Sequence, residues 1–287
     1  MRPQDTAAGK SVRQRLLNRS RKSGEDYNLL LTRFGVERLL YRLSRSDQAD
    51  QFILKGAMLF AVWTGKIHRP TRDLDLLGFG EPSVEGLVSI FRSLCQCVVE
   101  DDGLLFDADA VTCEPIRDEQ AYGGMRVKLM AYLGKARISL QIDVGFGDAV
   151  TPKATLIQFP TLLDHPAPRI RAYPPETVVA EKIQAMVSLG IANSRMKDFY
   201  DVWVLLHNFE LDRAMLARAI RATFERRQTP MPTAMPVAMS EDFIADPAKQ
   251  SQWRGFLGRS GLPGDLTLKE VVNTLRERLA PLLGISD

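Results

Sequence analysis

The stretch that decides the fold is Arg69-Pro70-Thr71-Arg72-Asp73-Leu74-Asp75-Leu76-Leu77. Acidic and apolar residues alternate from Asp73 onward, which is the period of a β-strand with one polar face. On such a strand Asp73 and Asp75 project to one side, while Leu74 and Leu76 face the core. A surface strand with solvated acids has the same pattern, so the alternation alone leaves both interpretations open.

The chemistry of this strand depends on its two carboxylates. Side by side they repel each other, and a divalent cation supplies the counter-charge. Mg²⁺ held by one or two carboxylates and by substrate phosphates is typical of phosphoryl-transfer sites. Upstream, Leu54-Lys55-Gly56-Ala57 predicts a strand that ends in a tight turn of small residues. Such a turn lets backbone N–H groups approach a triphosphate closely.

A third carboxylate follows in a second alternating segment, Ser139-Leu140-Gln141-Ile142-Asp143-Val144-Gly145. Its apolar residues share one face and leave Asp143 on the other. A third acid on a neighbouring strand would complete a two-metal site with Asp73 and Asp75. The alternative is a solvated strand acid, or an acid that anchors the turn at Gly145 and Gly147.

The pattern of apolar residues in the 287-residue chain changes near Tyr173. Before it, strand and helix patterns mix; after it, helical periodicity dominates over residues 176–189, 195–207, 212–227 and 267–283. We therefore predict an α+β fold in three parts. These are a basic mobile arm over residues 1–24, a domain of mixed β-sheet and helices over residues 25–172, and a helical domain over residues 173–287.

The helical half contains a second group of polar candidates. Lys182 borders an apolar helical stripe, where it could bind a phosphate or be a lysine at the edge of the core. Asp198 and Asp201 are three residues apart and share a helical face. Arg195 precedes them beside Ser194, a candidate N-cap. An acid in a first helical turn also complements the helix dipole, which is the alternative role for Asp198.

Together these motifs resemble one family. The strand, small-residue turn and D-x-D strand are similar to the nucleotidyltransferase superfamily, where Gly-Ser or Gly-Gly is usual in place of Gly56-Ala57. The combination of L-K-G-A, T-R-D-L-D, I-D-V-G-F-G-D, P-E-x-x-x-A-E-K and R-x-K-D-x-x-D-V between about residues 50 and 207 resembles the AbiEii/AbiGii toxin family, which includes the MenT toxins.

The resemblance implies a nucleotidyltransferase-like sheet domain and an NTP-dependent toxin that acts beside a cognate antitoxin. Some similar members add nucleotides to the 3′ end of tRNA, so tRNA or another RNA is the expected acceptor, with Mg²⁺ or Mn²⁺ as cofactor. The implied catalytic residues are Asp73, Asp75, Lys182, Asp201, Asp198 and Asp143, of which Asp73, Asp75 and Asp143 would hold metal. The pattern does not separate Asp198 from Asp201. The nucleotide-binding candidates are Lys55, Gly56, Ala57, Thr71, Arg72, Lys182 and Arg195.

Two features bear on acceptor and regulation. A positive track for RNA could come from the arm at residues 2–22, or from the helix with Arg213, Arg218, Arg221, Arg226 and Arg227, although charged helix faces are often only solvated. Thr71, two residues before Asp73, would share its strand face. Phosphorylation there would place negative charge against the carboxylates, whereas the alternative is an ordinary β-branched strand residue.

Two other function classes stay open. A small-molecule nucleotidyltransferase would use the same carboxylates without a basic surface. An inactive binding protein on this fold is compatible with Ala57 in the turn. The three cysteines and three scattered histidines do not have the spacing of a structural zinc site, so the sequence argues against one. No apolar run reaches the ~18 residues of a membrane helix, so we expect a cytoplasmic protein without a membrane partner.

Overall fold

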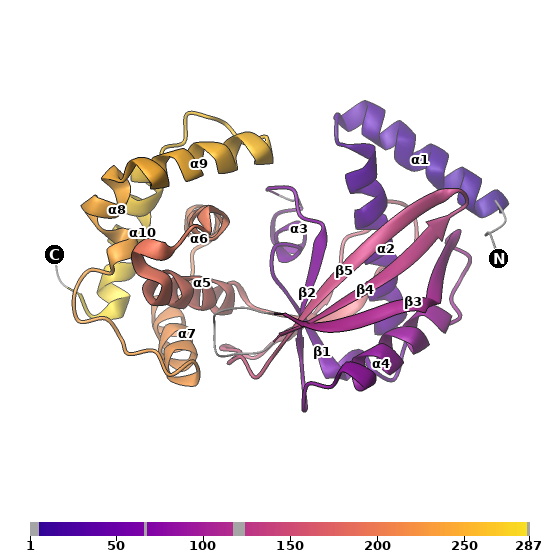
Figure 1. Ribbon diagram of the computed structural model, residues 1–287, viewed down its shortest axis with the longest axis horizontal. Helices are drawn as coiled ribbons and strands as arrows, with labels where there is room; N and C mark the ends of the chain where they lie inside the picture. The colour runs from indigo at the N-terminus through magenta and orange to yellow at the C-terminus, as the bar shows by residue number, and fades with distance from the viewer. Residues whose placement is uncertain (1–5, 66–67, 117–123, 286–287) are drawn as a thin grey trace. The chain divides into compact units, whose positions relative to one another are not determined.

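The computed structural model describes residues 6–65, 68–116 and 124–285. The chain divides into two compact units, which are taken separately below. Unit 1 comprises residues 1–147 and 155–172, and unit 2 comprises residues 148–154 and 173–287. Figure 1 labels the helices and strands of both.

Unit 1 is built on a mixed sheet with the strand order β3-β4-β5-β2-β1-β7-β6. Strand β2 is parallel to β5, and β1 is parallel to β7; the other neighbours are antiparallel. The strands are β1 (Phe52–Lys55), β2 (Asp73–Gly78), β3 (Leu104–Ile116), β4 (Gly124–Leu133), β5 (Ala136–Phe146), β6 (Thr155–Gln158) and β7 (Arg169–Ala172).

Helices α2 (Tyr27–Ser44) and α4 (Val84–Gln96) lie against the sheet of unit 1 (Figure 1). Gly35 of α2 lies against Leu140 of β5, where an added Cβ would be 3.2 Å from the leucine side chain. Phe91 of α4 packs edge-on against Phe52 of β1, with ring centroids 6.1 Å apart. The helices are α1 (Ala7–Ser23), α2 (Tyr27–Ser44), α3 (Leu59–Thr64) and α4 (Val84–Gln96), and a 3₁₀ turn spans Ala49–Gln51.

The structure differs from the expected mobile arm over residues 1–24. Residues 7–23 form helix α1, while residues 1–5 of the arm lie outside the described residues. Val12 and Leu16 are four residues apart on one helical face, and both are buried. Arg19 donates to the carbonyl of Leu162 at 2.9 Å. Val12 and Leu16 alone did not predict a packed helix in so basic a segment, because the residues that bury them lie far along the chain.

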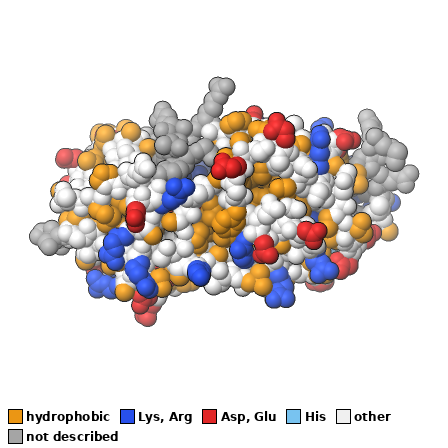
Figure 2. All heavy atoms as spheres, turned by 90° about the horizontal axis from the view of Figure 1, so that it is seen from below, with side chains coloured by type: hydrophobic (Ala, Val, Ile, Leu, Met, Phe, Trp, Pro, Cys, Tyr) orange, Lys and Arg blue, Asp and Glu red, His pale blue; other side chains and the backbone are white. Residues whose placement is uncertain are grey.

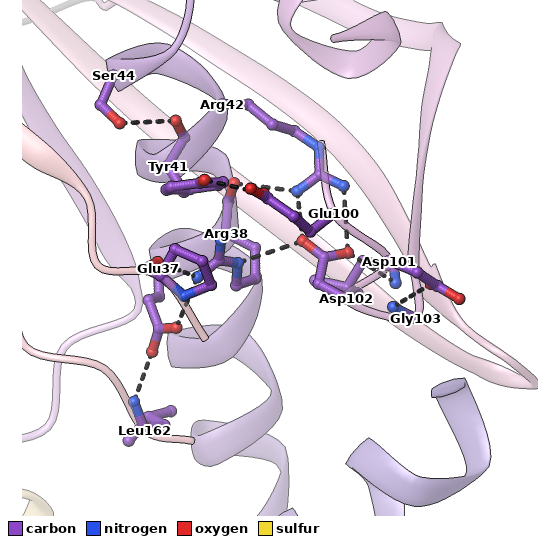
Figure 3. A network of polar contacts seen from close by, with 12 residues as sticks. Glu37, Arg38, Tyr41, Arg42, Ser44, Glu100, Asp101, Asp102, Gly103 and Leu162 are labelled. Atoms are coloured by element: carbon purple, nitrogen blue, oxygen red, sulfur yellow. Dashed lines mark hydrogen bonds and ion pairs between the residues drawn. The ribbon is translucent and has the colours of Figure 1, made fainter. Parts of the chain in front are cut away.

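A buried polar network ties α2 to two loops of unit 1 (Figure 3). Arg42 forms two hydrogen bonds with the Asp102 carboxylate, at 2.7 and 3.2 Å, and Arg38 donates to the same group. Glu37 accepts the backbone N–H of Leu162 at 2.7 Å. Burial raises the pKa of Glu37 to about 7. These groups are nearly inaccessible to water, so their role is to fix the loops against the helix.

Unit 2 is helical, with a core of aromatic and aliphatic side chains. Phe199 stacks on Phe243 at 5.3 Å between centroids, and Trp253 donates to the Leu266 carbonyl at 2.7 Å. Thr267 and Glu270 form a capping box at the last helix, a motif that the sequence shows directly. The helices are α5 (Pro175–Leu189), α6 (Met196–Asn208), α7 (Arg213–Arg226), α8 (Glu241–Ala245), α9 (Pro247–Ser260) and α10 (Leu268–Leu283), with 3₁₀ turns at Gly190–Ala192 and Val237–Met239.

The α+β prediction is confirmed: a mixed sheet with helices is followed by a helical C-terminal part. The expected strands at 52–54 and 73–77 are present. Ser83 precedes a periodic apolar run, which is the sequence pattern of a helix N-cap, and it caps α4. The sequence pattern indicates a strand over residues 109–116, whereas β3 begins five residues earlier, at Leu104. Strands β6 and β7 were not predicted. Both missed strands have only four residues, which is too short for a period to be recognised.

Candidate active site

Strand β2 presents Asp73 and Asp75 to one face and Leu74 and Leu76 to the other, as the alternation predicts. Leu74 and Leu76 are buried, whereas Asp73 is exposed and Asp75 is half-buried. The leucines pair in register with Ile142 and Val144 on the apolar face of β5. The packed core on one side therefore forces both carboxylates onto the other face of the sheet.

Charged residues of five strands form one row across that polar face. Register pairs Lys55 of β1 with Asp75 of β2, and Asp75 with Asp143 of β5. Asp143 is in turn opposite Arg126 of β4, which is opposite Glu114 of β3. Neighbouring strands are about 4.8 Å apart, so these side chains are close enough to interact. The sheet thus brings Asp143 beside the D-x-D strand.

The carboxylate of Asp143 is held by an arginine that the motif did not predict. Nε and Nη2 of Arg126 donate to the two Asp143 oxygens, each at 2.8 Å. These hydrogen bonds, with the nearby charge of Asp143, raise the pKa of Arg126. The three-carboxylate metal site therefore remains a prediction, because Asp143 would have to release Arg126 to become a ligand.

The described residues contain no group of three or more His, Cys, Asp or Glu side chains arranged to hold a metal ion. Asp73 and Asp75 nevertheless fit Mg²⁺ or Mn²⁺ chemically. Both are oxygen donors on the accessible face of one strand, and Mg²⁺ is commonly held by only one or two carboxylates together with substrate phosphates and water.

The Gly56 turn packs directly against Asp75. Gly56 has φ of +74°, in the left-handed region that favours glycine, and an added Cβ would lie 2.0 Å from Oδ2 of Asp75. Only a residue without a side chain allows the turn to approach the carboxylate this closely. Ala57 follows and is buried, so its methyl group belongs to the core rather than to the polar face.

Two other candidates precede the strand rather than belong to it. Strand β2 begins at Asp73, so Thr71 and Arg72 lie in the preceding loop. The expectation that Thr71 shares the strand face of Asp73 is therefore wrong, because strand alternation does not extend to it. Arg72 is exposed and Thr71 is half-buried.

In unit 2, Lys182 joins the two acids that sequence alone could not separate. Nζ of Lys182 on α5 lies 2.6 Å from Oδ1 of Asp198 and 2.9 Å from Oδ2 of Asp201, both on α6. Nε of Arg195 forms a third ion pair, 2.8 Å from Oδ2 of Asp198. We call these four residues the lysine cluster. Both acids contact the lysine, so neither is only a complement to the helix dipole.

The charges of the lysine cluster stabilise one another out of water. The Asp198 side chain is 2 % exposed, and that of Lys182 is 14 % exposed. Burial alone would raise the pKa of Asp198, but Lys182 and then Arg195 outweigh it and lower this pKa to about 2. Asp198 is therefore ionised at neutral pH, and it fixes the ammonium group of Lys182.

Comparison with known proteins decides the family. The model of the nucleotidyl transferase AbiEii toxin family, from type IV toxin–antitoxin systems, matches residues 38–275. The chain belongs to the AbiEii family. The resemblance inferred from the motifs is confirmed, and membership implies an antitoxin as partner.

Solved structures give more distant likenesses to this AbiEii protein. JHP933 from Helicobacter pylori is 15 % identical, with 86 % of this chain and 88 % of that chain covered and a TM-score of 0.49. A candidate nucleotidyltransferase from H. pylori is also 15 % identical, with 86 % and 91 % covered and a TM-score of 0.48. No curated protein matched the chain. Among the described residues, no helix is both long and apolar enough to cross a membrane.

The AbiEii motifs also contain a buried ion pair that sequence reasoning missed. Arg227, expected on a basic track, lies 2.8 Å from Asp148 and 3.6 Å from Glu181, and its side chain is 13 % exposed. Burial opposes the charge, but Glu181 and Asp148 raise the pKa of Arg227. Asp148 is the last residue of the motif I-D-V-G-F-G-D, and Glu181 is the acid of A-E-K. Neither acid had an assigned role in the predicted site, and this was the sequence signal that a cation such as Arg227 pairs with them.

Proposed function

We propose that this AbiEii protein is a metal-dependent toxin that transfers NMP from an NTP to the 3′-OH of an RNA, with the tRNA acceptor end as the expected acceptor. The placement of Asp73 and Asp75 on the accessible face of β2 carries the proposal, with the Gly56 turn packed against Asp75. Two carboxylates can hold the metal ion that assists phosphoryl transfer, and a glycine turn lets backbone N–H groups approach the triphosphate.

The proposal assigns metal binding and phosphate contact to different residues. Asp73 and Asp75 would hold Mg²⁺ or Mn²⁺, which when bound lowers the pKa of the attacking hydroxyl and offsets charge on the leaving group. Lys182 would contact the nucleotide phosphates with an ammonium group that Asp198 and Asp201 orient. The new bond joins the RNA 3′-oxygen to the α-phosphorus, the α–β phosphoanhydride bond breaks, and pyrophosphate leaves as the hydroxyl proton passes to a carboxylate or to water.

An RNA acceptor is supported by exposed cations in unit 2. Arg213, Arg218, Arg221 and Arg226 of α7 are all exposed, in contrast to Arg227. On the face shown in Figure 2, Lys and Arg side chains are interspersed with Asp and Glu side chains, which agrees with the formal net charge of +3. Contact with phosphates is therefore expected from local groups of cations rather than from the net charge.

An end-labelling assay tests the proposal. The full chain is incubated with total tRNA, Mg²⁺ and each α-labelled NTP in turn, beside Asp73→Ala and a control, Asp47→Ala, which removes an exposed acid. We expect label on tRNA with the wild-type chain and with Asp47→Ala, and a loss on the order of 100-fold in Asp73→Ala. No label with any NTP, from folded and unphosphorylated protein, would contradict the RNA acceptor and favour a small-molecule acceptor or an inactive binding protein.

The antitoxin could act through Thr71, although not by the strand geometry first expected. A phosphate in this loop, two residues before Asp73, would add about −1.5 to −2 charge near the metal-binding carboxylates. The proposal predicts a phosphate on Thr71 in protein co-expressed with its genetic neighbour. Mass spectrometry that finds Thr71 unmodified in inhibited protein would remove it.

A further inference from the structure

A basic groove lies in unit 2, between the first turn of α6 and helix α9. Its volume is about 630 Å³, and its lining includes Arg195, Lys197, Ser251, Gln252, Phe256 and Arg259. Phe256 is held in place by Tyr200 and Trp253, with ring centroids at 5.7 and 5.5 Å. The wall contributed by α9 is therefore fixed by core packing.

The charge of this groove has one sign. Three of its lining residues are cations, and no Asp or Glu is among them. Helix α9 itself carries Lys249, Arg254 and Arg259 and no acidic residue. Lys197 and Arg259 are exposed at the groove, while Arg195 is anchored by its ion pair with Asp198. Cations that gather without carboxylates favour an anionic ligand.

The groove is also joined to the lysine cluster through Arg195. This guanidinium lines the groove and contacts Asp198, whose other oxygen is 2.6 Å from Nζ of Lys182. A ligand in the groove would therefore lie beside the residue to which the proposed function assigns nucleotide phosphates.

We propose that this groove binds backbone phosphates of the RNA strand whose 3′ end is the acceptor. The inference rests on the proposed function and adds to it Ser251, Gln252 and Arg259 of α9, which the motifs do not contain. Cations on two separate helices match phosphates repeated along a strand better than one compact triphosphate. Ser251 and Gln252 supply hydroxyl and amide groups of the kind that contact phosphate and sugar. Phe256 is only 8 % exposed, so base stacking is a minor contribution.

The test compares two arginines of the same helix. Arg259→Ala removes a groove cation, whereas Arg254→Ala removes an exposed cation of α9 that does not line the groove. Binding of a fluorescent oligoribonucleotide with a tRNA-like 3′ end is measured with the full chain, without NTP, at several salt concentrations. NTP binding is measured separately, and circular dichroism verifies the fold of each variant.

We expect Arg259→Ala to weaken oligoribonucleotide binding about fivefold and to reduce the salt slope by about 0.7, because one phosphate contact with a single strand is lost. Arg254→Ala should behave as the wild-type chain, and NTP affinity should not change in either variant. Equal effects of the two substitutions, an unchanged Arg259→Ala, or a loss confined to NTP binding would each overturn the proposal.

The outcome is separable from that of the proposed function. RNA binding without NTP requires no chemistry, so Asp73→Ala should still bind the oligoribonucleotide. If wild-type protein labels no RNA but Arg259→Ala still weakens binding selectively, the groove stands and the transferase proposal fails. If the wild-type protein labels RNA, and Arg259→Ala binds and labels RNA as the wild-type protein does, the groove proposal is contradicted and the transferase proposal stands.

Discussion

At the scale of single residues, the contact between Gly56 and Asp75 makes the turn part of the candidate site. Gly56→Ala would place a methyl group 2.0 Å from Oδ2 of Asp75 in a backbone with φ of +74°. We expect the carboxylate to be displaced and end-labelling to fall as far as in Asp75→Ala. Gly65→Ala is the matched control, since Gly65 has φ of +69° but no atom within 4 Å of the added Cβ.

In the control, Gly65→Ala, only the strain of the left-handed backbone should lower the free energy of unfolding, by about 1 kcal/mol, and the labelling activity should not change. Equal activity in the two alanine variants would show that Asp75 tolerates displacement. The assay is the same end-labelling reaction, with urea unfolding to measure the free energy of each variant.

The lysine cluster leads to a prediction about pH. Its cations lower the pKa of Asp198 from 3.8 to about 2, so unfolded chains bind more protons between these values. The stability contributed by this charge is complete above about pH 3.8 and is lost as the pH falls through about 2. That contribution is on the order of 2 kcal/mol. Asp198→Asn should therefore be less stable at neutral pH, by about 3 kcal/mol, and should lose less stability on acidification.

Tryptophan fluorescence can report this effect from unit 2. In a Trp63→Phe background the remaining tryptophans, Trp203 and Trp253, both belong to unit 2. Urea unfolding of Asp198→Asn is compared at pH 7, 4.5 and 2.5 with the parent chain and with Asp242→Asn, which removes an exposed acid. Parallel pH dependence of Asp198→Asn and its parent would contradict the assigned charge state.

At the scale of elements, helix α1 is expected to stabilise unit 1 whether or not it binds RNA. Leu16 is fully buried, so Leu16→Ala should lower the free energy of unfolding by about 3 kcal/mol. Lys10 is exposed on the same helix, and Lys10→Ala should change it by less than about 0.5 kcal/mol. The measurement is urea unfolding followed by circular dichroism. A mobile arm, in contrast, would make the two substitutions equivalent.

The candidate site could be predicted from sequence where its elements have a local period. Alternation placed Asp73, Asp75 and Asp143 correctly on the polar face, and helical spacing placed Asp198 beside Asp201. The partner Arg126 was also within reach. Gly134-Lys135 lies between two strand-like segments, 125–132 and 136–146, which is typical of a hairpin turn. Such a turn pairs Leu133 with Ala136 and so sets Arg126 opposite Asp143.

Contacts between distant segments could not be derived in this way. The pairing of Arg227 with Asp148 joins residues 79 apart in the chain, and no local period encodes it. The same holds for α1, whose Gly9 lies against the backbone of Gly103. Composition predicted a mobile arm over residues 1–24 and left the arginine-rich helix open between an RNA track and a solvated face, whereas tertiary packing buries part of each segment. The groove between α6 and α9 was missed for the same reason, since its exposed cations, Lys197 and Arg259, are 62 residues apart in the chain.

At the scale of the whole molecule, membership in a toxin family leaves open whether toxicity needs the transfer reaction. The active-enzyme and binding-protein interpretations differ in their expectation for Asp73→Ala. This acid is exposed at the start of β2, so its removal should leave the fold intact and only the proposed metal site impaired. A catalytic toxin then loses its effect on growth, whereas a toxin that acts by binding keeps it.

We therefore expect induced wild-type protein to arrest growth in cells without the antitoxin, and Asp73→Ala to permit growth at the rate of an empty vector. Asp47→Ala, which also removes one exposed acid, should arrest growth as the wild-type chain does. Colony counts and growth curves are compared at protein levels matched by immunoblot. Arrest by Asp73→Ala would favour a binding protein, whatever the end-labelling assay shows, because toxicity would then not depend on the carboxylates of β2.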